Sequence, residues 1–184
     1  IASYAAPGAP VVTIGSLSKL VWPGLRIGWV RAAEPIVERL ARVKSAVDIG
    51  CPLVTQAIAV RLLGALDEAR TLRRRQLRPR RDLLAGLLEK ELPGWKFDLP
   101  AGGLFLWIKL PRGDAREFAQ VALRRGLVLL PGPVMSATEQ HAQFLRVPFL
   151  AEPDTLRAAV ARLASAWREY DSAARPTRAP LAMV

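Results

Sequence analysis

A short stretch near the start of the chain places a lysine between hydroxyl groups and an arginine. The stretch reads SLSKLVWPGLRIGW, and its polar side chains are Ser16, Ser18, Lys19 and Arg26. Serine hydroxyls and a planar guanidinium are donors that suit a phosphate, because the guanidinium can bind two phosphate oxygens at once. A lysine beside such a clamp faces the group that carries the phosphate. The pattern therefore predicts a phosphate site with an amine next to it.

The amine of Lys19 is suited to covalent chemistry with an aldehyde. A lysine that is buried beside another cation loses its proton more readily, and the neutral amine can form a Schiff base. We therefore expect Lys19 to be buried near Arg26. A phosphate clamp next to an imine-forming lysine is the combination that pyridoxal 5'-phosphate requires. The alternative is that Lys19 is an ordinary surface lysine and the two serines are ordinary loop residues.

Two short strands are expected to position these residues. Residues 11–15 are a β-branched run that ends in glycine, which predicts a buried strand. Residues 25–30, after Pro23 and Gly24, predict a second strand. The serines and the lysine then follow the carboxyl end of the first strand, where open α/β sheets place their ligands.

Helices are predicted at residues 35–47, 52–66 and 67–92. The third is highly charged and contains Pro79, which we expect to kink or divide it. Its basic cluster, LRRRQLRPRRD at residues 72–82, could be a nucleic-acid patch or a solvated helix face. No aromatic residue lies among these arginines, and single-strand stacking needs aromatic rings. The sequence therefore favours the solvated face.

After Gly94 the pattern changes to a compact β-β-α-β-β-α unit. Strands are predicted at 95–99, 103–110, 127–130 and 144–149, and helices at 114–125 and 154–170, each beginning at an aspartate N-cap. Arg146 is the only charge within FLRVPFL. A charge in an apolar strand needs a partner. The alternatives are the carboxylate of a bound ligand and a salt bridge to a neighbouring acid.

Composition limits the class of protein. The 184 residues are 51% hydrophobic and carry a net charge of +11, without an apolar run long enough to span a membrane. The lone Cys51 forms no internal disulfide, which agrees with a cytoplasmic protein. His141 is the only histidine, so no metal site is expected. The chain begins with Ile1 and reaches a strand within a few residues, which indicates a segment of a longer protein.

The lysine stretch resembles a known signature. S-x-S-K followed by P-G-x-R-x-G looks like the cofactor-lysine motif of fold-type I pyridoxal-phosphate enzymes, the class I/II aminotransferases. Three further stretches resemble the small domain of that family: AGGLFLW (101–107), LLPG (129–132) and FLRVPF (144–149). The similarity is greatest to the aminotransferase-like domain of MocR-type regulators in the GntR family.

The resemblance implies an α/β fold: the end of the large-domain sheet plus the complete small C-terminal domain. Residues 1–70 would be the C-terminal part of the large domain, 71–170 the small domain with its bridging helix, and 171–184 a flexible tail. Lys19 would bind the cofactor and act as base. Ser16, Ser18 and Arg26 would hold the phosphate of pyridoxal 5'-phosphate.

The resemblance also implies partners. Arg146 would bind the carboxylate of an amino acid or keto acid, and the protein would form homodimers. Two functions remain open: an aminotransferase, and an effector-sensing domain of a regulator with little or no transaminase activity. DNA would be bound only through a winged-helix module that this chain lacks. The acidic residue that pairs with the pyridine nitrogen in this family is expected upstream of the lysine and is missing here.

Overall fold

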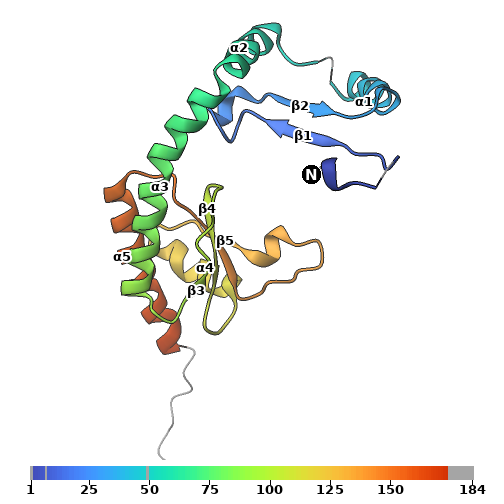
Figure 1. Cartoon of the computed structure of the whole chain (residues 1–184). Coiled ribbons are helices and arrows are strands. Elements are labelled where there is room, and N and C mark those ends of the chain that lie inside the picture. The colour runs from blue at the N-terminus through green and yellow to red at the C-terminus, as the bar shows by residue number, and fades with distance from the viewer. Residues whose placement is uncertain (1, 7, 49, 174–184) are drawn as a thin grey trace, which may run out of the picture. The chain divides into compact units, whose positions relative to one another are not determined.

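The computed structural model describes residues 2–6, 8–48 and 50–173 (Figure 1). The chain divides into two compact units, residues 1–74 and 75–184. Helix α3 (Leu66–Glu91) contributes residues to both, and the domain boundary expected from the sequence, 70/71, lies in the same helix. Of the predicted tail, residues 171–173 belong to helix α5 (Pro153–Ala173) and the rest lie outside the described residues.

The first unit contains a two-stranded antiparallel sheet and helices. Strand β1 (Thr13–Ser16) pairs with β2 (Gly28–Arg31) so that Ser16 lies opposite Gly28. Short 3₁₀ turns precede each strand, η1 (Ala2–Tyr4) and η2 (Pro23–Leu25). Helices α1 (Glu34–Val47), α2 (Leu53–Gly64) and the start of α3 follow. The small buried core of this unit consists of Leu17, Leu25, Ile27 and Ala59.

Two predictions for this unit are wrong. The strand expected to be buried is exposed, with Ile14 77% exposed, because β1 has one partner strand and the small core lies under the loop that follows it. The second strand begins at Gly28 rather than residue 25. Pro23 fixes a turn at η2, and Arg26 then adopts φ 49° and ψ 34°, outside the β region.

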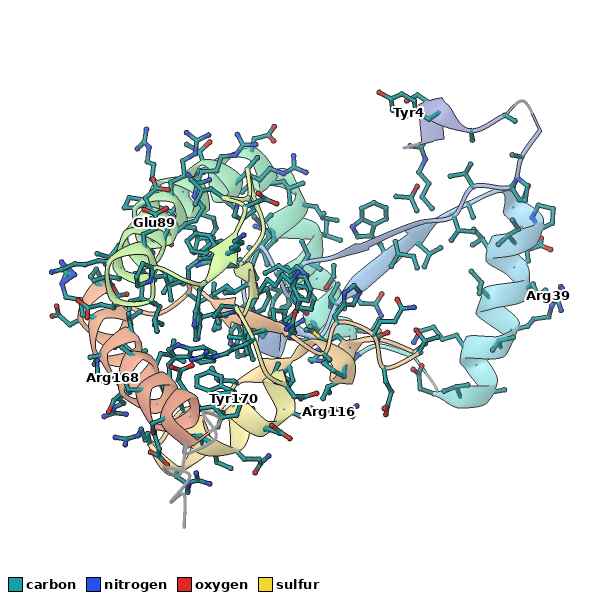
Figure 2. All side chains as sticks on the ribbon, turned by 90° about the horizontal axis from the view of Figure 1, so that it is seen from below. Tyr4, Arg39, Glu89, Arg116, Arg168 and Tyr170 are labelled. Carbon is teal, nitrogen blue, oxygen red and sulfur yellow. The ribbon has the colours of Figure 1, made fainter. Side chains whose placement is uncertain are left out.

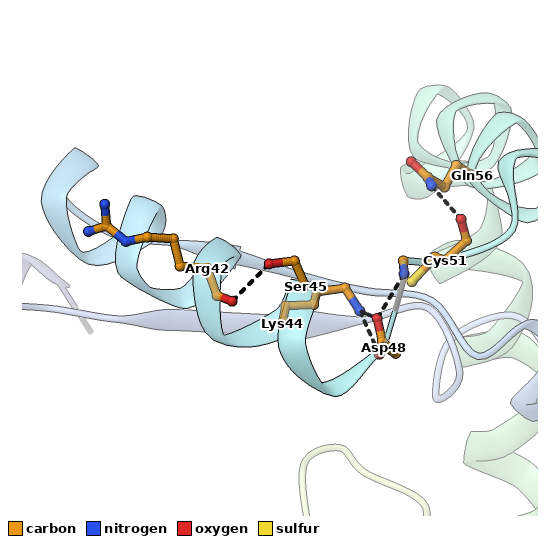
Figure 3. Close-up of polar contacts among 7 residues, drawn as sticks. Arg42, Lys44, Ser45, Asp48, Cys51 and Gln56 are labelled. Atoms are coloured by element: carbon orange, nitrogen blue, oxygen red, sulfur yellow. Dashed lines mark hydrogen bonds and ion pairs between the residues drawn. The ribbon is translucent and has the colours of Figure 1, made fainter.

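Helix α1 ends in a small polar cluster (Figure 3). Lys44 Nζ lies 2.7 Å from Asp48 Oδ1, and the backbone N–H of Gly50 donates to the same oxygen at 3.0 Å. The ion pair places a lysine near the negative end of the helix and neutralises the aspartate there. The hydrogen bond between the two side chains lowers the pKa of Asp48 and raises the pKa of Lys44. Gln56 Nε2 donates to the Cys51 carbonyl at 2.7 Å, which fixes the connection to α2.

The second unit has the predicted β-β-α-β-β-α order. Strands β3 (Lys96–Phe97) and β4 (Phe105–Lys109) precede helix α4 (Ala115–Arg124), which is followed by β5 (Leu130–Pro131), the 3₁₀ turn η3 (Gly132–Met135), β6 (Phe144–Pro148) and α5. The sheet has the antiparallel order β3-β4-β6-β5. Asp114 caps α4 as predicted, because its carboxylate accepts the N–H of Arg116 at 2.7 Å.

Side chains from both helices and the sheet fill the core of this unit. Leu106, Ile108 and Leu145 of the central strands are fully buried, as is Phe118 of α4. Tyr170 lies between α5 and α4, whereas Arg168 lies on the exposed side of α5 (Figure 2). The mixed α/β architecture predicted from the sequence is confirmed. None of the helices in the described part of the chain is long and apolar enough to cross a membrane.

Helix α3 is a single helix across Pro79, so the prediction that proline would divide it is wrong. Proline removes one backbone donor, but the next two residues tie the helix to neighbouring loops. Arg80 Nη1 donates to the Leu150 carbonyl at 2.6 Å, and Arg81 Nη1 donates to the Pro100 carbonyl at 2.7 Å. These contacts and the burial of Leu84 keep the helix continuous.

Candidate functional site

Alternating burial orients the loop that carries the lysine. Leu25 and Ile27 are 5% and 9% exposed, whereas Arg26 between them is exposed. Leu17 is 2% exposed, whereas Lys19 is exposed. The apolar residues of the loop thus anchor it in the small core. The two cations are left on its open side.

Backbone pairing brings the serine segment beside the arginine. The N–H of Leu17 donates to the Ile27 carbonyl at 3.1 Å, which extends the β1–β2 ladder by one residue beyond the Ser16–Gly28 pair. Ser16 Oγ donates to the same carbonyl at 3.4 Å and accepts the N–H of Ser18 at 3.2 Å. The segment 16–18 therefore runs alongside 26–28, as a shared phosphate site requires.

Gly28 makes this close pairing possible. A Cβ atom at Gly28 would lie 2.8 Å from the carbonyl oxygen of Gly15, closer than real Cβ contacts. Only glycine therefore allows the two strands to approach at the start of the loop.

Three donor groups of this loop have no protein partner among the described residues: the Ser18 hydroxyl, the Lys19 amine and the Arg26 guanidinium. Arg26 is also held in the left-handed region, at φ 49°, which is costly for a residue other than glycine. Backbone strain of this kind gathers at ligand sites. Unpaired donors on a loop with a strained arginine fit a phosphate-bearing ligand.

Lys19 is exposed in this structure, although the sequence analysis expected it to be buried. The neighbouring apolar side chains turn into the core beneath the loop, and none of the described residues of the first unit covers the amine. The burial that Schiff-base chemistry favours must therefore come from groups other than these.

An apolar hollow of about 410 Å³ lies beside the loop in the first unit. Lys19 and Arg26 do not line it. Its lining is Gly15, Ser16, Leu17, Leu20, Trp29, Leu63, Leu66 and Arg70. The hollow therefore suits an apolar group rather than the phosphate that the loop donors fit.

Arg146 belongs to the second unit and lies on the sheet face that turns away from the core. Its neighbours Leu145 and Val147 are buried, and Arg146 itself is half-buried. Its Nε atom is buried without a hydrogen-bond partner, and no described carboxylate pairs with it. The salt bridge that the sequence left open as an alternative is therefore not formed within the described residues.

Sequence reasoning missed Phe105, whose ring lies under Arg146. The guanidinium carbon is 4.3 Å from the ring centroid. The signal was present in the sequence, because Phe105 and Trp107 alternate with buried Leu106 in GGLFLW. The pairing of β4 with β6 was needed to bring that face to Arg146.

The basic cluster is partly engaged within the protein. Arg80 and Arg81 bind loop carbonyls, as described above, and Arg80 also pairs with Glu152. These two arginines position loops of the second unit, which weakens the nucleic-acid alternative. Among the described residues, no group of three or more His, Cys, Asp or Glu side chains is placed to hold a metal ion.

Comparison with known proteins identifies relatives of two kinds. The family model of class I and II aminotransferases matches residues 2–163. Aromatic-amino-acid aminotransferase 1 of Thermococcus litoralis is 32% identical over 164 residues, which are 86% of this chain and 39% of that protein. The uncharacterized HTH-type transcriptional regulator YdfD of Bacillus subtilis is 34% identical over 145 residues, which are 76% of this chain and 29% of the regulator.

A solved aminotransferase structure also matches the chain. LysN, an alpha-aminoadipate aminotransferase from Thermus thermophilus complexed with N-(5'-phosphopyridoxyl)-L-leucine, superimposes with a TM-score of 0.84 at 26% identity. The match covers 91% of this chain and 44% of LysN. The chain thus spans less than half the length of each of these relatives.

Proposed function

Because the chain belongs to the class I and II aminotransferase family, we propose that it is the part of a pyridoxal-phosphate-dependent aminotransferase that carries the cofactor lysine and the carboxylate-binding arginine. The observation that carries the proposal is the set of unpaired donors at Ser18, Lys19 and Arg26 on one strained loop. The phosphopyridoxyl ligand of the related LysN supports the choice of cofactor.

The loop residues have separate roles in this proposal. Pyridoxal phosphate, when bound, supplies an aldehyde and an electron-withdrawing ring. Ser18 and Arg26 would donate hydrogen bonds to its phosphate, and Ser16 would join them by turning its hydroxyl away from the Ile27 carbonyl. Lys19 Nζ would bind the aldehyde and, once the substrate amine has displaced it, the free amine would accept the proton from the substrate Cα as a general base.

Arg146 binds the substrate carboxylate. Its position in a strand whose neighbours are buried fixes its backbone, and no described carboxylate occupies its guanidinium, whose planar fork suits a bidentate bond. The substrate is accordingly an amino acid and the acceptor a keto acid. The family relationship supports a homodimer, and the single Cys51 is compatible with the reducing cytoplasm.

A second candidate function is that of an effector-sensing domain in a transcription regulator. It is favoured by the match to YdfD, which is 34% identical where the Thermococcus litoralis enzyme is 32% identical. The same loop and Arg146 would then bind a cofactor and an amine without efficient turnover. DNA would be bound by a separate module.

Substituting Lys19 tests the site in the complete natural protein. Lys19→Ala should abolish the visible absorption of the protein-bound cofactor, whereas Lys44→Ala, an exposed lysine of the same unit paired with Asp48, should not change it. An unchanged spectrum in Lys19→Ala would refute the assignment.

The two candidate functions differ in turnover. An aminotransferase should convert amino acids and keto acids over many cycles. A regulator should bind them with at most a single slow exchange and should bind DNA through a winged-helix segment encoded in the same reading frame. Finding such a segment together with absent turnover would decide for the regulator.

A further inference from the structure

The contact between Phe105 and Arg146 joins two central strands on one face of the sheet. In the register of β4 and β6, Leu106 lies opposite Val147 and Ile108 opposite Leu145, and all four side chains are buried. The intervening residues therefore share the opposite face. Arg146 lies diagonally across from Phe105 there, with its guanidinium carbon 4.3 Å from the ring centroid.

Among the described residues, the ring of Phe105 is the sole partner of this half-buried guanidinium, which is unusual. Arg146 has a buried Nε without a hydrogen-bond acceptor, and no carboxylate of the described residues reaches it. An acidic partner would occupy the N–H donors that a ligand carboxylate needs. The face of an aromatic ring attracts the cation, but it accepts no hydrogen bond from the N–H groups that point outward in the guanidinium plane. Phe105 thus holds the arginine without supplying an acceptor for its N–H groups.

The ring itself is held by paired strands. Phe105 begins β4 and lies opposite Pro148 of β6. The carbonyl of Leu104, the preceding residue, accepts the N–H of Phe149 at 3.1 Å. The ring therefore belongs to the sheet rather than to a free loop, and it can restrict the many rotamers of an arginine side chain.

We propose that Phe105 is a positioning residue that pre-organises Arg146 for a ligand carboxylate through its aromatic face. This inference rests on the proposed function, because it takes the carboxylate site at Arg146 as its premise. Without the ring, the ligand must order the arginine side chain itself, which corresponds to about a five-fold loss of carboxylate affinity.

Calorimetric titration of the complete, cofactor-loaded protein tests this role. The probes are 3-phenylpropionate and 3-phenylpropan-1-ol, which differ in the carboxylate and have no amine to react. Phe105→Leu should weaken binding of the carboxylate about five-fold and leave the alcohol unchanged. Phe105→Tyr, which keeps the ring face, should bind both probes as the unsubstituted protein does.

Three results would overturn the positioning role. These are unchanged carboxylate affinity in Phe105→Leu, equal weakening of both probes, and equal losses in the Leu and Tyr variants. Arg146→Leu distinguishes failure of the positioning role from failure of the proposed function. This variant should bind the carboxylate probe no better than the alcohol. If Arg146→Leu keeps a preference for the carboxylate, or the unsubstituted protein has none, the carboxylate site itself is wrong.

A measurement on the unsubstituted protein keeps the proposal testable if Phe105→Leu does not fold. A proton above an aromatic face resonates upfield, so the Nε–H signal of Arg146, assigned by its loss in Arg146→Lys, should be shifted upfield of the other arginine signals. A signal at the ordinary position would overturn the proposal.

Discussion

Replacing Tyr170 with phenylalanine should destabilise the second unit by about 1–2 kcal/mol. Tyr170 is 8% exposed, and its hydroxyl accepts the backbone N–H of Asp114 at 2.9 Å and donates to Glu117 Oε2 at 3.1 Å. Phenylalanine keeps the ring and its packing against Phe118 and Trp167. The loss therefore comes from the hydroxyl. The N–H of Asp114 loses its acceptor in this variant. The expected loss lies at the lower end of the cost of a buried donor without a partner, because Asp114 is only half-buried.

The same substitution should change how stability depends on alkaline pH. Burial raises the pKa of Tyr170 above its usual value of about 10. A raised pKa in the folded state means that folding favours the neutral phenol. This contribution is complete below about pH 10 and is lost as the pH rises through the raised pKa. The stability difference between the two proteins should therefore shrink above about pH 10.

Urea unfolding followed by tryptophan fluorescence measures both effects, because Trp95 and Trp167 pack in the core of this unit. Tyr4→Phe is the matched control, since Tyr4 is 92% exposed and its hydroxyl should contribute nothing. Equal stability of Tyr170→Phe and the unsubstituted protein would show that the hydroxyl does not stabilise the second unit. A difference that does not shrink above about pH 10 would contradict the expected pH dependence.

Three further substitutions test other parts of the structure. Gly86→Ala should stabilise α3 by about 0.5–1 kcal/mol in urea unfolding, because a Cβ there meets no atom within 4 Å; a loss would contradict this. Gly28→Ala should destabilise the first unit by about 1–3 kcal/mol through the clash with the Gly15 carbonyl, and undiminished amide protection in β1 and β2 would disprove the close approach. Arg81→Gln should cost about 1–2 kcal/mol by removing the 2.7 Å bond to the Pro100 carbonyl, so unchanged urea stability would exclude that anchoring role.

Local sequence signals predicted the order of elements in the second unit and one of its two expected N-caps, because α5 begins at Pro153 and Asp154 lies inside the helix. The order of its strands and helices and the cap at Asp114 follow from alternation, turn residues and capping chemistry, which act over a few residues. The aminotransferase resemblance, carried by Lys19 and its neighbours, is confirmed by the family match.

Features that depend on distant contacts escaped prediction. Pro79 stays within one helix because Arg80 and Arg81 bind loops about 70 and 19 residues away in sequence. The exposure of Lys19 depends on which groups cover the loop, and a local pattern does not contain them. The stacking of Phe105 on Arg146 required the register between β4 and β6. The candidate site residues thus stay predictions from the sequence, and their surroundings were beyond its reach.

Covalent trapping tests most directly whether Lys19 Nζ is the amine that binds the cofactor aldehyde. The complete protein is loaded with pyridoxal phosphate, reduced with borohydride, digested and mapped by mass spectrometry. The account predicts a phosphopyridoxyl group on the peptide that contains Lys19. A group on another lysine such as Lys44, or the absence of any modification after loading, would contradict it.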